Sequence, residues 1–163
     1  MKKYLLVLPL AVFLFAAGMP VSAKTYSKIE LLTIVLNNTY AGTGTYTEET
    51  CGPSDEDPTI EISFDNIDIA GTVIAASVFD GTTIYDSTGT IKKKPGNSFY
   101  TLKLDGTASD DIAEYTINLK GRITKTKPTM IRKVKLTAVA DLNEDFSIDK
   151  CESAITFKKL PAQ

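Results

Sequence analysis

The segment Ser98-Phe-Tyr-Thr-Leu-Lys-Leu104 decides the fold class, because apolar and polar side chains alternate along it. In an extended chain Tyr100, Leu102 and Leu104 fall on one side, opposite Phe99, Thr101 and Lys103. The same alternation predicts two further apolar faces, made of Tyr115, Ile117 and Leu119 and of Val134, Leu136 and Ala138. A sheet with one apolar and one wet face is typical of an antiparallel barrel or sandwich.

Eight consecutive strands are predicted, separated by glycine, proline, asparagine and aspartate. They cover residues 39–47, 59–66, 72–79, 83–92, 98–104, 112–125, 130–140 and 153–158. Turn chemistry favours tight reversals at Asp80-Gly81, Asp105-Gly106, Lys94-Pro-Gly-Asn97 and Lys127-Pro-Thr129. Hairpins in series predict an all-β, eight-stranded antiparallel meander that closes into a barrel, with a β-sandwich as the alternative.

A short helix is predicted ahead of the first strand. Ser27-Lys-Ile-Glu30 has the capping-box pattern, in which a serine and a glutamate three residues later satisfy free amides at a helix start. We therefore expect a helix over residues 28–37. The β-branched residues of this segment leave a strand as the alternative, since they lose rotamer freedom in a helix.

The N-terminal 23 residues have the three parts of a secretory signal peptide. Met1-Lys-Lys is followed by an apolar run and then by the small-residue site Val21-Ser-Ala23. The run is short for a membrane span, so a retained anchor is the weaker alternative. We expect an exported protein, periplasmic or secreted, whose residues 24–163 form a single β domain.

Composition excludes several classes of function. The chain has no histidine, which removes Ser-His-Asp and Cys-His mechanisms and histidine-bearing zinc sites. Without Lys2 and Lys3, 16 basic residues face 20 acidic ones, a net charge near −4 that argues against nucleic acid as a partner. No nucleophile motif is present in the sequence, and we expect a protein that is not an enzyme.

The two cysteines predict one disulfide, because exported proteins meet oxidising conditions. In a closed eight-stranded meander, the loops after strands one, three, five and seven share one end, and the last strand lies beside the first. Cys51 falls in the first of these loops and Cys151 in the last. The bridge would join the barrel's seam; a Greek-key sandwich would also allow it, and two free thiols are the other alternative.

The same strand order sorts the charged residues to opposite ends. The loops at the cysteine end carry most of the acidic residues, whereas the far end carries Lys92, Lys93, Lys94 and the basic hairpin 120–133. A molecule with separated charge is oriented by charged partners. The basic end could contact an anionic membrane surface; the alternative is that these charges are ordinary solvated loops.

One segment carries oxygen-bearing side chains at regular intervals. Asp141-Leu-Asn-Glu-Asp-Phe-Ser-Ile-Asp-Lys-Cys-Glu152 resembles an EF-hand-type, dockerin-like calcium loop, with Phe146 where the pattern has glycine. The resemblance implies calcium as a cofactor and these ligands: Asp141, Asn143, Asp145, Ser147, Asp149 and Glu152. The alternative is a solvated acidic turn between two strands.

Two functions remain open on this reading. The first is a non-catalytic binding protein whose barrel, similar in architecture to the calycins and lipocalins, encloses a small apolar ligand. The second is an interaction module of the envelope or exterior, stabilised by calcium and a disulfide and lacking a ligand cavity, whose partner is another envelope protein. A solvent-filled interior would favour the first function, and a filled interior the second.

Overall fold

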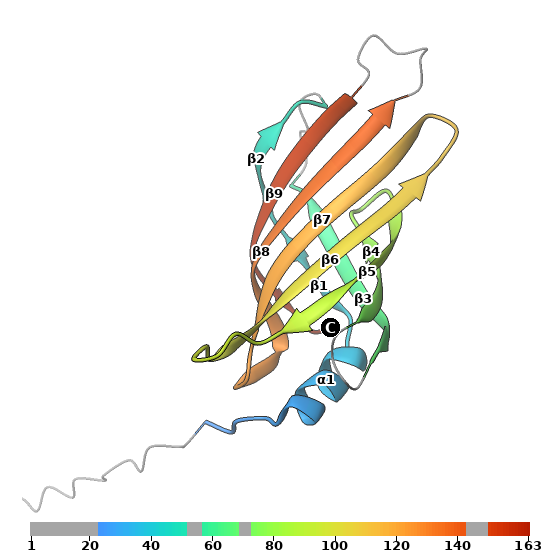
Figure 1. Ribbon diagram of the computed structural model, residues 1–163. Helices are drawn as coiled ribbons and strands as arrows, with labels where there is room; N and C mark the ends of the chain where they lie inside the picture. Colours follow the sequence, from blue (N-terminus) through green and yellow to red (C-terminus); the bar gives the residue numbers. More distant parts are fainter. Residues whose placement is uncertain (1–22, 52–56, 69–72, 143–149) are drawn as a thin grey trace, which may run out of the picture.

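The protein is an antiparallel β-barrel with a seam, which confirms the predicted all-β meander and favours the barrel over the sandwich (Figure 1). The computed structural model describes residues 23–51, 57–68, 73–142 and 150–163. From β3 onward, each strand pairs with the next one along the chain. The later strands are β3 (Thr59–Ile67), β4 (Ile74–Phe79), β5 (Ile84–Lys92), β6 (Phe99–Ser109), β7 (Ala113–Thr124), β8 (Lys127–Leu142) and β9 (Lys150–Pro161).

The segment predicted as one strand, residues 39–47, forms two strands in the structure, and these two strands close the barrel. β1 (Tyr40–Thr43) pairs with β3, and β2 (Thr45–Glu49) pairs with β9. The break lies at Gly44, where a Cβ atom would stand 2.7 Å from the ring of Phe157. The chain therefore changes partners at a glycine, and nine strands form where the alternation predicts eight.

Two of the four predicted turns are confirmed, and two lie elsewhere. Gly81 and Gly96 have φ of 102° and 80°, as their hairpins require. Asp105-Gly106 was wrongly predicted as a turn: Gly106 lies inside β6, where its missing Cβ lets Ser87 approach. The β7–β8 reversal falls at residues 125–126, ahead of the predicted 127–129.

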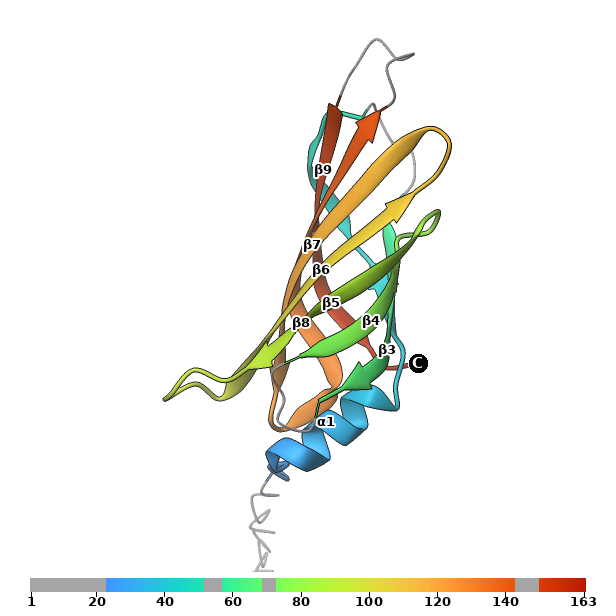
Figure 2. The same cartoon turned by 45° about the vertical axis from the view of Figure 1, so that its right-hand side comes forward.

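Helix α1 (Lys28–Leu36) closes one end of the barrel, which we call the helix end; the other is the cysteine end (Figure 2). The capping box is present, with the backbone N–H of Ser27 donating to Glu30 and the N–H of Glu30 donating to the Ser27 hydroxyl. Leu31, Leu32 and Val35 are buried against the sheet. This segment, the helix that the structure describes, is too short to span a membrane.

The interior contains the apolar face that the alternation predicts. Seven of the nine predicted residues are buried, while Tyr115 and Ala138 are partly buried and pack against the core. Tyr40 is fully buried, and its phenol O–H donates to the carbonyl of Pro128 at 2.8 Å. This bond satisfies the one polar atom that Tyr40 brings inside, since burying an unpaired hydroxyl is costly.

Candidate functional site

The predicted disulfide is present and lies at the seam. Cys51 and Cys151 are bonded, with their Cα atoms 4.8 Å apart. Beside the bridge, the backbone N–H of Thr50 donates to the Glu152 carbonyl at 2.9 Å, and the N–H of Glu152 donates to the Thr50 hydroxyl at 2.7 Å. The bridge therefore continues the β2–β9 pairing by which the barrel closes.

The predicted calcium loop falls largely outside the described residues. Asp141 lies next to the last residue of β8, opposite Lys150, and Glu152 lies in β9 opposite Val139; both side chains are exposed. Asn143, Asp145, Ser147 and Asp149 belong to the stretch 143–149, which the structure does not describe. Among the described residues no group of three metal-ligating acidic or thiol side chains occurs. Calcium binding stays a prediction.

Two hairpins at the cysteine end share a side-chain arrangement that the sequence reading missed. In the β4–β5 loop, Asp80 accepts hydrogen bonds from the backbone of Thr82 and Thr83 and, at 2.8 Å, from the phenol of Tyr85. In the β6–β7 loop, Asp110 likewise accepts from two backbone amides and, at 3.1 Å, from Tyr115. The signal is an Asp followed by a Tyr five residues later, present twice.

These contacts shift the acidity of the groups involved. Burial raises the pKa of Tyr85, and the hydrogen bond to Asp80 raises this pKa further. The pKa of Asp110 is lowered by the backbone hydrogen bonds from Ala113 and Ile112. Burial alone raises the pKa of Tyr40. The neutral phenols are thus favoured in the folded state, in keeping with hydrogen bonds that only a protonated phenol can donate.

We predict that the protein loses stability as the pH rises above about 10, the pKa of tyrosine in an unfolded chain. Above that pH the unfolded state releases the protons of Tyr40 and Tyr85 while the folded state keeps them. The free energy of unfolding then falls by about 1.4 kcal/mol per pH unit for each phenol. Urea unfolding between pH 8 and 11 would measure this slope.

Tyr85→Phe should make that slope shallower by about one phenol's share. Tyr46→Phe is the matched control, because the Tyr46 side chain is only partly buried. Equal slopes in wild type and Tyr85→Phe would contradict the prediction. The slope is the quantity to compare, since the substitution also removes the hydrogen bond to Asp80 at every pH.

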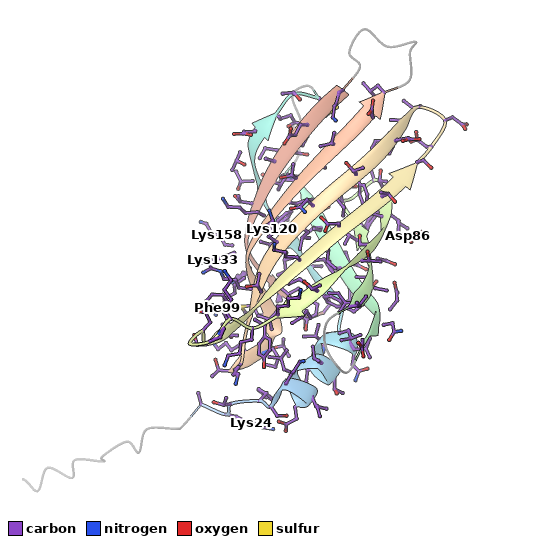
Figure 3. The ribbon with its side chains drawn as sticks, in the orientation of Figure 1. Lys24, Asp86, Phe99, Lys120, Lys133 and Lys158 are labelled. Atoms are coloured by element: carbon purple, nitrogen blue, oxygen red, sulfur yellow. A yellow bond between two sulfur atoms is a disulfide. The ribbon has the colours of Figure 1, made fainter. Side chains whose placement is uncertain are left out.

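The strongest candidate for a binding surface lies on the outside of the sheet near the helix end. A groove of about 700 Å³ crosses β5 to β8, with Thr90, Asn97 and Thr101 among its uncharged lining residues. We call it the basic groove after its seven cations: Lys92, Lys94, Lys103, Lys120, Arg122, Lys133 and Lys135. Phe99, Lys120 and Lys133 gather on this face, with Asp86 set apart (Figure 3).

Strand register places three of the lysines directly side by side. Lys103 of β6 is opposite Lys120 of β7, which is opposite Lys135 of β8. Like charges facing each other across strands are destabilising. In the part of the chain that the structure describes, none of these amines has a carboxylate within ion-pair distance. The fold therefore keeps an uncompensated row of positive charge on this face.

A backbone irregularity adds one more cation to the groove. Lys133 has φ of 52°, a left-handed conformation that costs a non-glycine residue roughly 1–2 kcal/mol. It forms a β-bulge, since Lys120 pairs with Lys135 and Arg122 with Arg132, which leaves two residues opposite Gly121. As a result the consecutive Arg132 and Lys133 are both exposed. The strained backbone conformation of Lys133 thus coincides with the exposure of two neighbouring cations.

The guanidinium in the groove is held by an aromatic ring. The guanidinium carbon of Arg122 lies 4.6 Å from the ring centre of Phe99, a cation–π contact between neighbouring strands. The contact uses the face of the guanidinium's charge cloud and leaves its N–H groups available to a ligand. Along the strands toward the cysteine end, the next outward positions are Thr88, Asp105, Asn118 and Thr137. The groove thus ends where the first carboxylate appears.

Comparison with known proteins gives no match to this chain among family models, curated proteins or solved structures. The functional argument therefore rests on the residues of this chain.

Proposed function

We propose that this protein is an exported, non-catalytic interaction module that binds an anionic partner through the basic groove. The observation that carries the proposal is the groove itself: seven cations on four adjacent strands and the connecting loop, without a neutralising carboxylate among the described residues. The protein as a whole is acidic, with a pI of about 5.2, so the positive charge of this face is opposite in sign to the net charge of the molecule at pH 7. Such a surface favours association with negative charge.

The barrel interior supports an outer binding surface rather than an internal ligand. Leu102, Leu104 and Leu119 expose none of their surface, either to the outside or to the inside of the barrel. Side chains that line a ligand cavity would retain accessible surface facing that space. Close-packed aliphatic residues are what an eight- or nine-stranded barrel needs when it is stabilised by its own core. The small-apolar-ligand function consequently has less support than the interaction module.

We predict that the oxidised protein lacking residues 1–23 is retained on a sulfopropyl cation exchanger at pH 7 and low salt, although its net charge is negative. Elution should occur as salt screens the groove, because the screening length falls to about 8 Å at 0.15 M. Lys120→Gln should elute at lower salt than wild type. Lys150→Gln, which removes the same charge at the cysteine end, should elute with wild type.

Passage of the wild type through the column without retention would contradict the proposal. Stoichiometric uptake of an apolar fluorescent probe by the wild type would instead support the small-ligand function. The calcium ion proposed for residues 141–152 would stabilise the cysteine end. Equal melting temperatures in calcium and in chelator would contradict calcium binding by residues 141–152.

A further inference from the structure

Five of the seven cations of the basic groove fall in two rows that run across the strands. The first row is the lysine row, Lys103, Lys120 and Lys135. The second lies two residues closer to the helix end and passes through Lys92, Thr101, Arg122, Arg132 and Lys159. Four of these five positions, on five adjacent strands, are basic. The charge is therefore arranged in lines, with Lys133 of the bulge between them.

We infer that the basic groove binds an extended acidic polysaccharide, a chain that carries a carboxylate or sulfate on successive sugar units. The inference rests on the proposed function and names its partner class. Neighbouring strands lie about 4.8 Å apart, so a chain lying along the lysine row meets a new cation at each strand of that row. That repeat is comparable to the length of one sugar ring in an extended glycan. A line of charge on the protein thus matches a line of charge on the ligand.

The uncharged part of the groove suits sugar hydroxyls. Thr90 and Thr101 present hydroxyls between the cations, and Asn97 adds an amide that both donates and accepts. Arg122, whose guanidinium lies over the ring of Phe99, carries a planar fork that suits bidentate binding of a carboxylate or sulfate. A purely electrostatic surface would not need these neutral groups at the same place.

An anionic membrane fits the same surface less well. Binding at a lipid interface combines charge with apolar side chains that enter the headgroup region. The exposed large apolar residues of the described chain are Ile29, Leu36, Val73, Phe79, Ile84 and Ile112, and none of them lines the groove.

Single-stranded nucleic acid would need exposed aromatic faces on which bases stack. Phe99 is the aromatic residue of the groove, and Arg122 covers one face of its ring. The polysaccharide is therefore the partner that uses both the charged rows and the neutral groups between them.

The test measures binding of the oxidised protein to polygalacturonate and dextran sulfate, with neutral dextran, phosphatidylglycerol vesicles and single-stranded DNA as comparisons. Wild type should bind the two acidic polysaccharides, more weakly as salt rises, and should not bind neutral dextran. Lys120→Gln should weaken binding about tenfold or more, the effect of losing one charge-assisted contact. Lys150→Gln, at the cysteine end, should change the affinity less than twofold.

Two further readouts separate recognition from folding and from charge. Lys120→Gln relieves repulsion in the lysine row, so it should unfold at a urea concentration no lower than wild type. Arg122→Lys keeps the charge but loses the fork, and should still weaken binding. Equal weakening by Lys120→Gln and Lys150→Gln would overturn the inference. So would tighter binding to the vesicles or to DNA than to either acidic polysaccharide.

These outcomes distinguish the two levels of the proposal. Retention on the cation exchanger together with a preference for vesicles or DNA would keep the anionic-partner function and overturn the polysaccharide. Absence of both retention and polysaccharide binding would overturn both.

Discussion

Replacing both cysteines with serine should lower the free energy of unfolding by about 4–5 kcal/mol. The bridge joins residues 100 positions apart, and a cross-link over so long a loop removes much of the freedom of the unfolded chain. A domain of this size has a total stability of roughly 5–15 kcal/mol, so the expected loss is a large part of it. Urea unfolding of Cys51→Ser/Cys151→Ser beside oxidised wild type would measure the difference.

Without the disulfide, local opening of the structure should increase first at the seam between β2 and β9. β2 pairs with β9 through four residue pairs interrupted by a bulge, whereas β7 and β8 pair along most of their length. Hydrogen exchange should therefore accelerate in residues 45–49 well before it does in β7. Reduced and alkylated wild type is the control, and should behave like the double variant. A change in stability below about 1 kcal/mol would contradict the chain-entropy account at this site.

At the seam, the sequence predicted the position of the disulfide but not the break between β1 and β2. The period-two pattern and the turn residues predicted the strand order, and the strand order placed Cys51 and Cys151 at one end. The break at Gly44 was not predicted, because residues 39–47 alternate as one strand would. Only the closed barrel, with the Phe157 ring against Gly44, requires the chain to leave β3 and join β9.

The false turn at Asp105-Gly106 has a similar origin. Asp-Gly is a strong local signal for a hairpin, but β6 continues through it to Ser109. The chain reverses instead at Asp110, whose carboxylate accepts hydrogen bonds from the backbone N–H groups of Ile112 and Ala113 in the same loop. Gly106 serves packing, not a turn, and a single sequence does not separate these two uses of glycine.

The basic groove was predicted in part. Sequence order placed Lys92 to Lys94 and the hairpin 120–133 at one end, which holds for the described strands. The lysine row depends on register, which sets Lys103, Lys120 and Lys135 side by side although they are 17 and 15 residues apart in the chain. The bulge at Lys133 had no sequence signal in β8, since a lysine and not a glycine occupies its left-handed position.

The second large effect is expected at Gly89, in the middle of β5. A Cβ atom there would lie 1.8 Å from the carbonyl oxygen of Lys103, which is backbone and cannot rotate away. Gly89 pairs with Leu104 of β6, so relief of the clash requires the two strands to separate beside the basic groove. We predict that Gly89→Ala destabilises the protein by more than about 4 kcal/mol, in the range of the most disruptive single substitutions.

Two comparisons make this prediction specific to the backbone contact. Gly106→Ala meets the Ser87 hydroxyl at 2.2 Å, a side-chain atom, so adding Ser87→Ala should recover much of its loss. No side-chain substitution can recover Gly89→Ala in the same way. Gly96→Ala, at a hairpin tip with no atom within 4 Å of the new Cβ, should cost only the roughly 1–2 kcal/mol of its positive φ. A loss in free energy of unfolding for Gly89→Ala that is no larger than the loss for Gly96→Ala would contradict the prediction. It would mean that β5 and β6 do not approach each other as closely at Gly89 as the structure has them, and that the strands beneath the basic groove lie differently.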